Sequence, residues 1–172
     1  MSMALVVVDM QRGLCSGEEE AFDAAALIGR VNGLIAKARA AGAPVVFVQH
    51  EEEGAPLQFG SEAWQIDERL ARKADDVRLR KTRPDAFAGT MLQAALGDVR
   101  RLVICGQQSD CCIDATVRGA LALGYQVTLA EDGHSTVDSG GTTAARIIAQ
   151  RNAALSDAGA TLRPAAEIGF TW

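Results

Sequence analysis

The chain has 172 residues, 48% of them hydrophobic, which suffices for one domain with a sizeable core. Its net charge is −5 and no run of basic residues occurs, so nucleic acid and anionic membranes are poor candidate partners. The longest apolar stretches are far shorter than a membrane span, and residues 1–20 lack the plan of a signal peptide. Four cysteines without a CxxC pair indicate reduced thiols. We therefore expect a single domain over residues 1–172 in the cytoplasm.

The first quarter of the chain predicts two buried strands joined by a helix. Residues 5–8 and 45–48 are short runs of β-branched and aromatic residues, which is typical of strands covered on both faces. Between them, apolar residues recur at helical spacing over residues 24–38. Gly42 and Pro44 end that helix.

The middle of the chain is less regular. Residues 51–63 carry glutamates, glycines and a proline, and predict a long loop of the kind that is often functional. A short helix is expected around residues 64–70, and residues 77–80 alternate apolar with basic side chains, as an edge strand does. A helix is expected over residues 87–96.

The last part repeats the strand–helix pattern. The expected elements are a strand at 102–105 stopped by Gly106, a helix that begins at Cys112 and ends by Gly124, a strand at 127–130, a polar turn at 131–139, a helix at 142–158 and a final strand at 161–163. Alternating strands and helices predict an α/β fold of three layers, in which helices cover both faces of a mostly parallel central sheet.

Chemically active side chains follow the ends of the predicted strands. Asp9 ends the first strand, His50 the second and Lys81 the third, while Cys112 follows the short turn after the fourth. Because ligands of such folds bind beyond the carboxyl ends of the strands, we expect these side chains to share a pocket.

An acid, a lysine and a thiol in one pocket predict nucleophilic catalysis. The start of a helix and a nearby ammonium both favour the thiolate form of Cys112, and Asp9 is suited to take the thiol proton as a general base. Backbone N–H groups of the turn would stabilise the oxyanion that forms when the thiolate attacks a carbonyl carbon. Cys105, inside a strand, is read as a small buried hydrophobe.

Four stretches in order resemble the isochorismatase-like cysteine hydrolase family over almost the whole chain. They are LVVVDMQRGL (5–14), VVFVQH (45–50), K-x₃-DAFAGT-x-L (81–92) and ICGQQSDCCIDATVRGALALGYQVTLAEDGHST (104–136). The resemblance implies a cysteine hydrolase that cleaves a C–N bond of a small amide, ureido compound or lactam through an acyl-cysteine intermediate. It also implies a homodimer or homotetramer.

The resemblance further implies the roles of particular residues. Asp9 would be the base, Lys81 its electrostatic partner and Cys112 the nucleophile. A non-proline cis peptide is implied between Gln107 and Gln108, and the backbone amides of Gln108 and Cys112 would form the oxyanion hole.

Two departures from the family pattern matter. The family's G-x-x-T turn has Ser109 at the threonine position, a mild change that keeps the hydroxyl. Nicotinamidases of this family bind a metal through a D-x-H pair and further histidines, whereas residues 49–51 read Gln-His-Glu and the only other histidine is His134, which we interpret as a structural turn residue. We therefore expect no metal, and no nucleotide fingerprint occurs to imply a cofactor. True isochorismatases lack the nucleophilic cysteine, so Cys112 argues against vinyl-ether hydrolysis.

Side chains that would contact a small-molecule substrate are expected near the strand ends. The candidates are Gln11, His50, Gln58, Trp64 and Phe87, although the aromatic residues are more often part of a core.

Alternatives remain open from the sequence. Cys111 adjoins Cys112 and competes for the role of nucleophile, and the spacing from Gly106 and Ser109 favours Cys112. The competing functions are a non-catalytic small-ligand-binding protein of the same fold and a redox protein that uses both cysteines. Adjacent cysteines have poor disulfide geometry, which argues against the redox reading.

Overall fold

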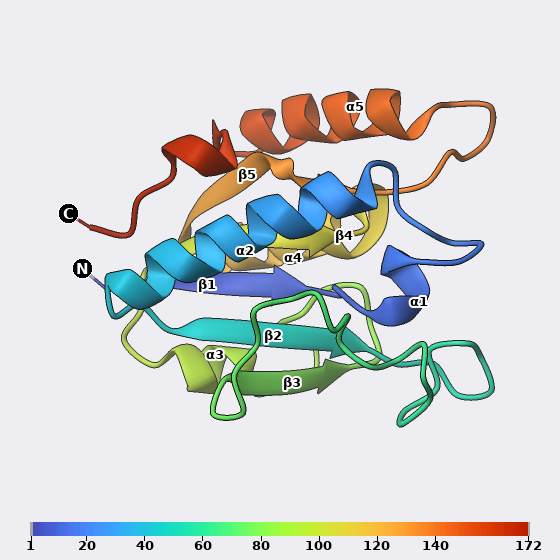
Figure 1. Ribbon diagram of the computed structural model, residues 1–172. Helices are drawn as coiled ribbons and strands as arrows, with labels where there is room; N and C mark the ends of the chain where they lie inside the picture. Colours follow the sequence, from blue (N-terminus) through green and yellow to red (C-terminus); the bar gives the residue numbers. More distant parts are fainter. Residues whose placement is uncertain (1, 172) are drawn as a thin grey trace.

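Six parallel strands form one sheet in the computed structural model, which describes residues 2–171. The strand order is β3-β2-β1-β4-β5-β6, so β1 lies in the middle and β3 at one edge, as the basic alternation of that strand predicted. The strands are β1 (Met3–Val8), β2 (Val45–His50), β3 (Val77–Lys81), β4 (Arg101–Gln107), β5 (Gln126–Ser135) and β6 (Thr161–Arg163). All their carboxyl ends point to the same side, which is the right-hand side of Figure 1.

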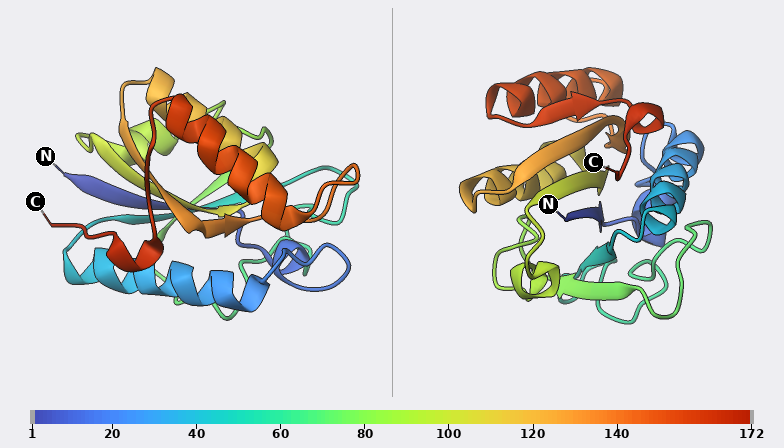
Figure 2. Two further views of the ribbon diagram at one scale, coloured as in Figure 1. Left: turned by 90° about the horizontal axis from the view of Figure 1, so that it is seen from above. Right: turned by 90° about the vertical axis from the view of Figure 1, so that its left-hand side faces the viewer.

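Helices cover both faces of the sheet, which confirms the predicted three-layer α/β fold. The helix α2 (Ala24–Ala40) lies on one face, and α3 (Leu92–Leu96), α4 (Asp114–Ala122) and α5 (Ala144–Asp157) lie on the other (Figure 2). The side chains of β1 alternate between the two cores: Leu5 and Val7 face α2, whereas Val6 and Val8 face α3 and α4. Among the helices of residues 2–171, none is long and apolar enough to cross a bilayer.

Strand β5 is longer than predicted. Residues 131–135, which were expected to belong to a polar turn, continue the strand as far as Ser135. The register with β4 shifts between Ile104 and Gly106, and beyond this irregularity His134 lies opposite Gly106. The strand continues because its last three residues are buried. Their burial was not predicted, because the two residues before them, Glu131 and Asp132, are polar.

Gly106 does not stop β4, contrary to the prediction; it lets β4 and β1 approach each other. Its φ is +124°, and a Cβ atom there would lie 2.0 Å from the carbonyl oxygen of Val8. The strand therefore reaches Gln107, and only glycine fits where the sheet's two central strands approach each other this closely.

The segments around the site differ from the predicted helices. Residues 64–70 form turns instead of a helix, and Ile66 pairs with Gln11 in an isolated antiparallel bridge. The expected helix at 87–96 is helical only from Leu92, because the preceding residues turn to bind α4, where the Ala86 N–H donates to the Thr116 hydroxyl at 3.0 Å. A short helix, α1 (Arg12–Cys15), follows β1 unpredicted.

Candidate active site

Asp9, Lys81 and Cys112 meet at the carboxyl ends of the central strands. The Lys81 Nζ atom lies 3.1 Å from Asp9 Oδ2 and 3.2 Å from Cys112 Sγ. The exposed fractions of the three residues are 1%, 2% and 7%, so the group is almost dehydrated. The structure thus brings together the three residues to which the sequence assigns catalysis.

Each of the three comes from a different element. Asp9 directly follows β1 with a φ of 51°, a left-handed conformation that aspartate tolerates better than most residues, and its N–H donates to the Val48 carbonyl at 2.9 Å. Lys81 is the last residue of β3, and Cys112 lies in the turn after β4.

The ammonium of Lys81 lies at the centre of the cluster. It also donates to His50 Nδ1 at 3.0 Å and to the Arg83 carbonyl at 3.1 Å. Asp9, His50 and Cys112 each offer a ligand atom within 4.8 Å of the others, a set that could hold a metal ion. Lys81 Nζ lies within 3.2 Å of all three side chains, so a cationic group already occupies the position between them.

Cys112 lies in a π-helical turn, η1 (Ser109–Ile113), and not in the regular helix start that the sequence predicted. The Gln108 carbonyl accepts the N–H groups of Cys111 and Ile113, both at 3.1 Å, and passes over that of Cys112 between them. The peptide bond between Gln107 and Gln108 is cis, at the position that the family resemblance implies. π-Turns of this kind are frequent at functional sites, since they leave backbone groups free to bind a ligand.

Burial sets the proton affinities in the site. Dehydration raises the pKa of Asp9, and the charge of Lys81 opposes this rise. Dehydration and the neighbouring Asp9 carboxylate raise the pKa of Cys112, which Lys81 again opposes. In the resting site, burial and the Asp9 carboxylate thus act against the effect of Lys81, which the sequence analysis expects to favour the thiolate of Cys112.

A proton can move between Cys112 and Asp9 without changing the net charge of the cluster. The carboxylate, ammonium and thiol together carry no net charge, and neither does the arrangement of carboxylic acid, ammonium and thiolate. Asp9 Oδ1 is buried and accepts no well-formed hydrogen bond, and the carboxylate lies within reach of the thiol. Loose hydrogen bonds of this kind are common in active sites without substrate.

A pocket of about 320 Å³ opens above the triad. Its wall includes Asp9, His50, Gln108, Cys111 and Cys112. The lining residues that the sequence analysis missed are Leu14, Glu19, Glu52, Leu57, Thr82 and Pro84. Only Glu52 and Thr82, which closely follow strand ends, carried a signal that could have identified them.

Of the predicted substrate contacts, His50 lines the pocket and Gln11 does not. The Gln11 side chain is fully buried, donates to the carbonyls of His50 (2.8 Å) and Trp64 (3.0 Å), and accepts the His50 N–H at 2.9 Å. It therefore fixes the end of β2. Trp64 is buried with its ring 4.9 Å from that of Phe59.

Gln58 and Phe87 also lie outside this pocket. Gln58 is exposed and lines a neighbouring hollow together with Glu52, Phe59 and Thr82. Phe87 stacks on Tyr125, with 5.5 Å between the ring centroids, and packs against the core on the α4 side. The structure therefore gives both side chains packing or surface positions.

His134 has the structural role that the sequence predicted. Asn152 donates its Nδ2 to the Glu131 carbonyl, so its Oδ1 accepts from His134 Nε2 at 2.7 Å. His134 Nδ1 then accepts the hydroxyl proton of Ser109 at 2.7 Å. Burial lowers the pKa of His134, so a neutral imidazole anchors the turn before Cys112.

All four cysteines are free, and two of them face the pocket. Cys105 is buried in β4, as predicted, and burial raises its pKa. Cys15 is buried too; its sulfur accepts from Gln107 Nε2 at 3.1 Å, and burial raises its pKa to about 12. Cys111 is exposed and lines the pocket, but it lacks the lysine contact that Cys112 has.

Comparison with known proteins identifies relatives across nearly the whole chain. The isochorismatase domain model matches residues 3–160. Streptothricin hydrolase of Streptomyces noursei is 40% identical over 140 residues, which cover 78% of this chain and 50% of that protein. The chain thus spans about half the length of the streptothricin hydrolases that it matches.

Solved structures share the fold closely. The crystal structure of an isochorismatase family protein superposes with a TM-score of 0.88 at 37% identity, and the match covers 94% of this chain and 97% of that one. N-carbamoylsarcosine amidase from Thermoplasma acidophilum superposes with a TM-score of 0.82 at 27% identity, over 98% and 99% of the two chains.

Proposed function

The chain belongs to the isochorismatase family, and on that premise we propose that it is a cysteine hydrolase that cleaves a C–N bond of a small amide, ureido compound or lactam. The observation that carries this proposal is the contact of one buried ammonium with both Asp9 (3.1 Å) and Cys112 (3.2 Å) at a pocket. The names of two relatives, a streptothricin hydrolase and an N-carbamoylsarcosine amidase, agree with hydrolysis of this class of bond.

The first half of the reaction forms an acyl-cysteine. The Cys112 thiol transfers its proton to Asp9 as Sγ attacks the carbonyl carbon, and the carbonyl oxygen becomes an oxyanion. The backbone N–H groups of Cys112 and Gln108 would bind this oxyanion, and each such donor is typically worth roughly 3–4 kcal/mol. Asp9 then returns the proton to the nitrogen, the C–N bond breaks, and the amine or ammonia leaves.

The second half regenerates the thiol. A water molecule gives one proton to Asp9 as its oxygen attacks the thioester, and a second oxyanion forms in the same position. Its collapse breaks the C–S bond, and Asp9 gives the proton back to Cys112. The raised pKa of Asp9 suits this role, because burial makes the carboxylate a stronger base than an exposed one.

The ammonium of Lys81 keeps these proton transfers feasible in a dehydrated site. It stabilises the carboxylate before the transfer and the thiolate after it, from contacts of 3.1 and 3.2 Å. The chain's own lysine thus serves in the place of an external cation, and no metal enters the proposed scheme.

The alternative function is binding of a small ligand in the same pocket without chemistry. A binding protein has little need for a thiol held between a base and an ammonium, so the geometry favours catalysis. We further propose that the protein acts in the cytoplasm as a homodimer or homotetramer; light scattering of the purified chain tests the assembly.

A panel of small amides, ureido compounds and lactams tests the catalytic proposal. Release of ammonia or amine is measured, and acid-quenched protein is weighed by intact mass spectrometry. We expect turnover with at least one compound class, together with an acyl adduct that is absent from Cys112→Ala. Turnover that persists in Cys112→Ala would contradict the mechanism, and saturable binding without turnover or adduct would favour the binding protein.

A further inference from the structure

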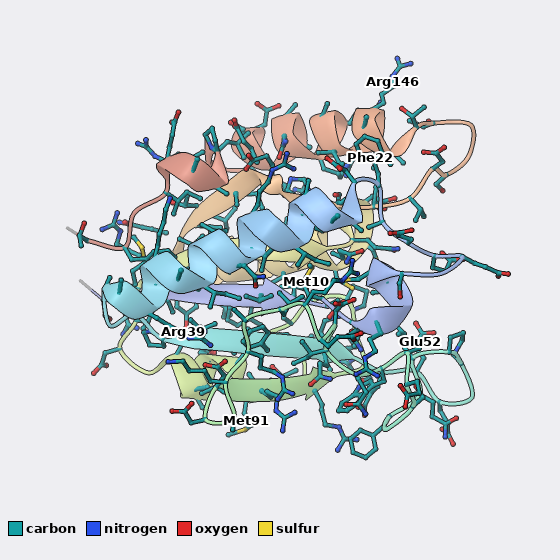
Figure 3. All side chains as sticks on the ribbon, in the orientation of Figure 1. Met10, Phe22, Arg39, Glu52, Met91 and Arg146 are labelled. Atoms are coloured by element: carbon teal, nitrogen blue, oxygen red, sulfur yellow. The ribbon has the colours of Figure 1, made fainter. Side chains whose placement is uncertain are left out.

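A histidine and a glutamate hold the ammonium of Lys81 from the side of the pocket. His50 Nδ1 lies 3.0 Å from Lys81 Nζ, and His50 Nε2 lies 3.0 Å from Glu52 Oε1. The backbone of His50 is fixed at both its N–H and its carbonyl by the side chain of Gln11. The imidazole ring is therefore held by three independent sets of contacts, at the end of the sheet that Glu52 marks in Figure 3.

The hydrogen-bond partners determine the tautomer of His50. A carboxylate can only accept, so the ring carries its proton on Nε2 and donates it to Glu52. Nδ1 then has a free lone pair, and it accepts a proton from the Lys81 ammonium. Glu52 thus sets the tautomer that makes His50 an acceptor for the lysine, as outer partners do for ligating histidines elsewhere.

The acceptors around Lys81 outnumber its protons. The ammonium has three N–H bonds, and four groups lie within 3.2 Å: Asp9, His50, Cys112 and the Arg83 carbonyl. His50 and the Arg83 carbonyl are neutral and do not change during the reaction. When each takes one proton, the third is left to be shared between Asp9 Oδ2 and Cys112 Sγ, the two atoms whose charges exchange.

We propose that His50, oriented by Glu52, is a positioning residue that directs the Lys81 ammonium onto Asp9 and Cys112. This inference rests on the proposed function, because it assigns His50 a role in the same triad. His50 acts through Lys81 and needs no contact with substrate.

Two substitutions at His50 separate positioning from packing. Asparagine places its Oδ1 where Nδ1 stands and keeps an acceptor for Lys81, whereas glutamine reaches toward the position of Nε2 and loses that acceptor. Both keep the backbone contacts with Gln11, and both are polar. The pair is therefore matched for size and polarity, and differs in the one contact that the proposal names.

The test measures the second-order rate of Cys112 alkylation by iodoacetamide at about pH 7.5, with Cys111→Ser present throughout so that only one thiol faces the pocket. We expect His50→Gln to slow alkylation about tenfold or more, because the ammonium loses the acceptor that holds it beside Cys112; the size is that of one charge-assisted hydrogen bond. His50→Asn should stay within about threefold of the parent rate. Thermal unfolding of each variant is recorded alongside.

Glu52 offers a second, weaker arm. Glu52→Ala removes the acceptor for Nε2 and should slow alkylation of Cys112 about twofold to fivefold, because its side chain is 58% exposed and water partly replaces it. Glu52→Gln keeps an acceptor and should restore most of the rate. Glu53→Ala, an exposed neighbour, is the matched control and should change nothing.

The outcomes distinguish this inference from the function on which it rests. Equal rates in His50→Asn and His50→Gln, whether both native or both slowed, would overturn the positioning role. If Lys81→Met slows the alkylation of Cys112 whereas the two His50 variants react equally, the positioning role of His50 fails and the triad stands. If Cys112 is alkylated at the same rate in the parent protein and in Lys81→Met, both the triad and the positioning role of His50 fail.

Discussion

Replacement of Lys81 by methionine is the most informative single change to the site. The side chain of Lys81 is completely buried beside an equally buried Asp9, so Lys81→Met leaves a carboxylate without its cation in a dehydrated place. Methionine has a similar length, which limits any loss of packing. The change therefore removes mainly a charge.

The expected loss of stability at neutral pH is large. Removal of one partner of a buried ion pair destabilises a protein by roughly 3–5 kcal/mol. The free energy of unfolding of a single domain is typically about 5–15 kcal/mol, so the variant should lose a substantial part of it. Because the unpaired charge of Asp9 causes this loss of stability, the loss should depend on pH.

The sign of that dependence follows from the pKa of Asp9. Burial raises this pKa above its ordinary value of 3.8 in the folded protein, so the stability from protonated Asp9 is full below 3.8 and is lost as pH rises through the folded pKa. Without Lys81 the folded pKa rises further, and the loss continues to higher pH. The deficit of Lys81→Met relative to the native protein should therefore grow from about pH 4 to pH 7.

Urea unfolding at several pH values measures this deficit, and Asp9→Asn/Lys81→Met is the control. The double variant lacks the stranded charge, and it should be more stable than Lys81→Met at neutral pH. A deficit below about 1 kcal/mol, or one independent of pH, would show that Asp9 is not left as an unpaired buried charge. A double variant no more stable than the single one would show that methionine packing, and not charge, causes the loss.

Three further predictions concern neighbouring features. Gly106→Ala should unfold at a markedly lower temperature, or fail to fold, because its Cβ would lie 2.0 Å from the Val8 carbonyl oxygen at a φ of +124°. A melting temperature within a few degrees of native would be inconsistent with this close approach of β1 and β4. Cys111→Ser should keep the alkylation rate of Cys112 within about twofold, since the lysine contact belongs to Cys112; a large loss would show that the reactivity of Cys112 depends on its neighbour. Treatment with EDTA should leave that rate unchanged, because Lys81 provides the cation of the site, and a slowed reaction that zinc restores would show a metal role that this geometry does not predict.

The fold and a shared pocket could be predicted from the strands and their ends, whereas the choice of Asp9, Lys81 and Cys112 as a triad came from the family resemblance. Buried apolar runs identify parallel strands, and parallel strands place their carboxyl ends together, so Asp9, Lys81 and Cys112 are expected at one edge from sequence positions alone. Their side chains then meet across β1, β3 and the turn after β4.

The features that the sequence did not predict depend on contacts between distant segments. β5 extends to Ser135 because burial against β4 overrides the polarity of residues 131–132. The sequence predicts a substrate contact for Gln11, but its side-chain amide instead donates hydrogen bonds to the carbonyls of His50, at the end of β2, and of Trp64. The raised pKa of Cys112 also escaped prediction, since helix position is visible in a sequence whereas the degree of dehydration is not.

The pH dependence of Cys112 alkylation is the sharpest test of an electrostatic triad in this site. In a Cys111→Ser background, the midpoint pH should fall in Asp9→Asn, because the carboxylate that raises the Cys112 pKa is gone and the ammonium remains. The midpoint should rise in Lys81→Met, because the ammonium that opposes the raised pKa is lost. An electrostatic triad requires shifts in these two opposite directions. A midpoint that moves the same way in both variants, or in neither, would contradict it.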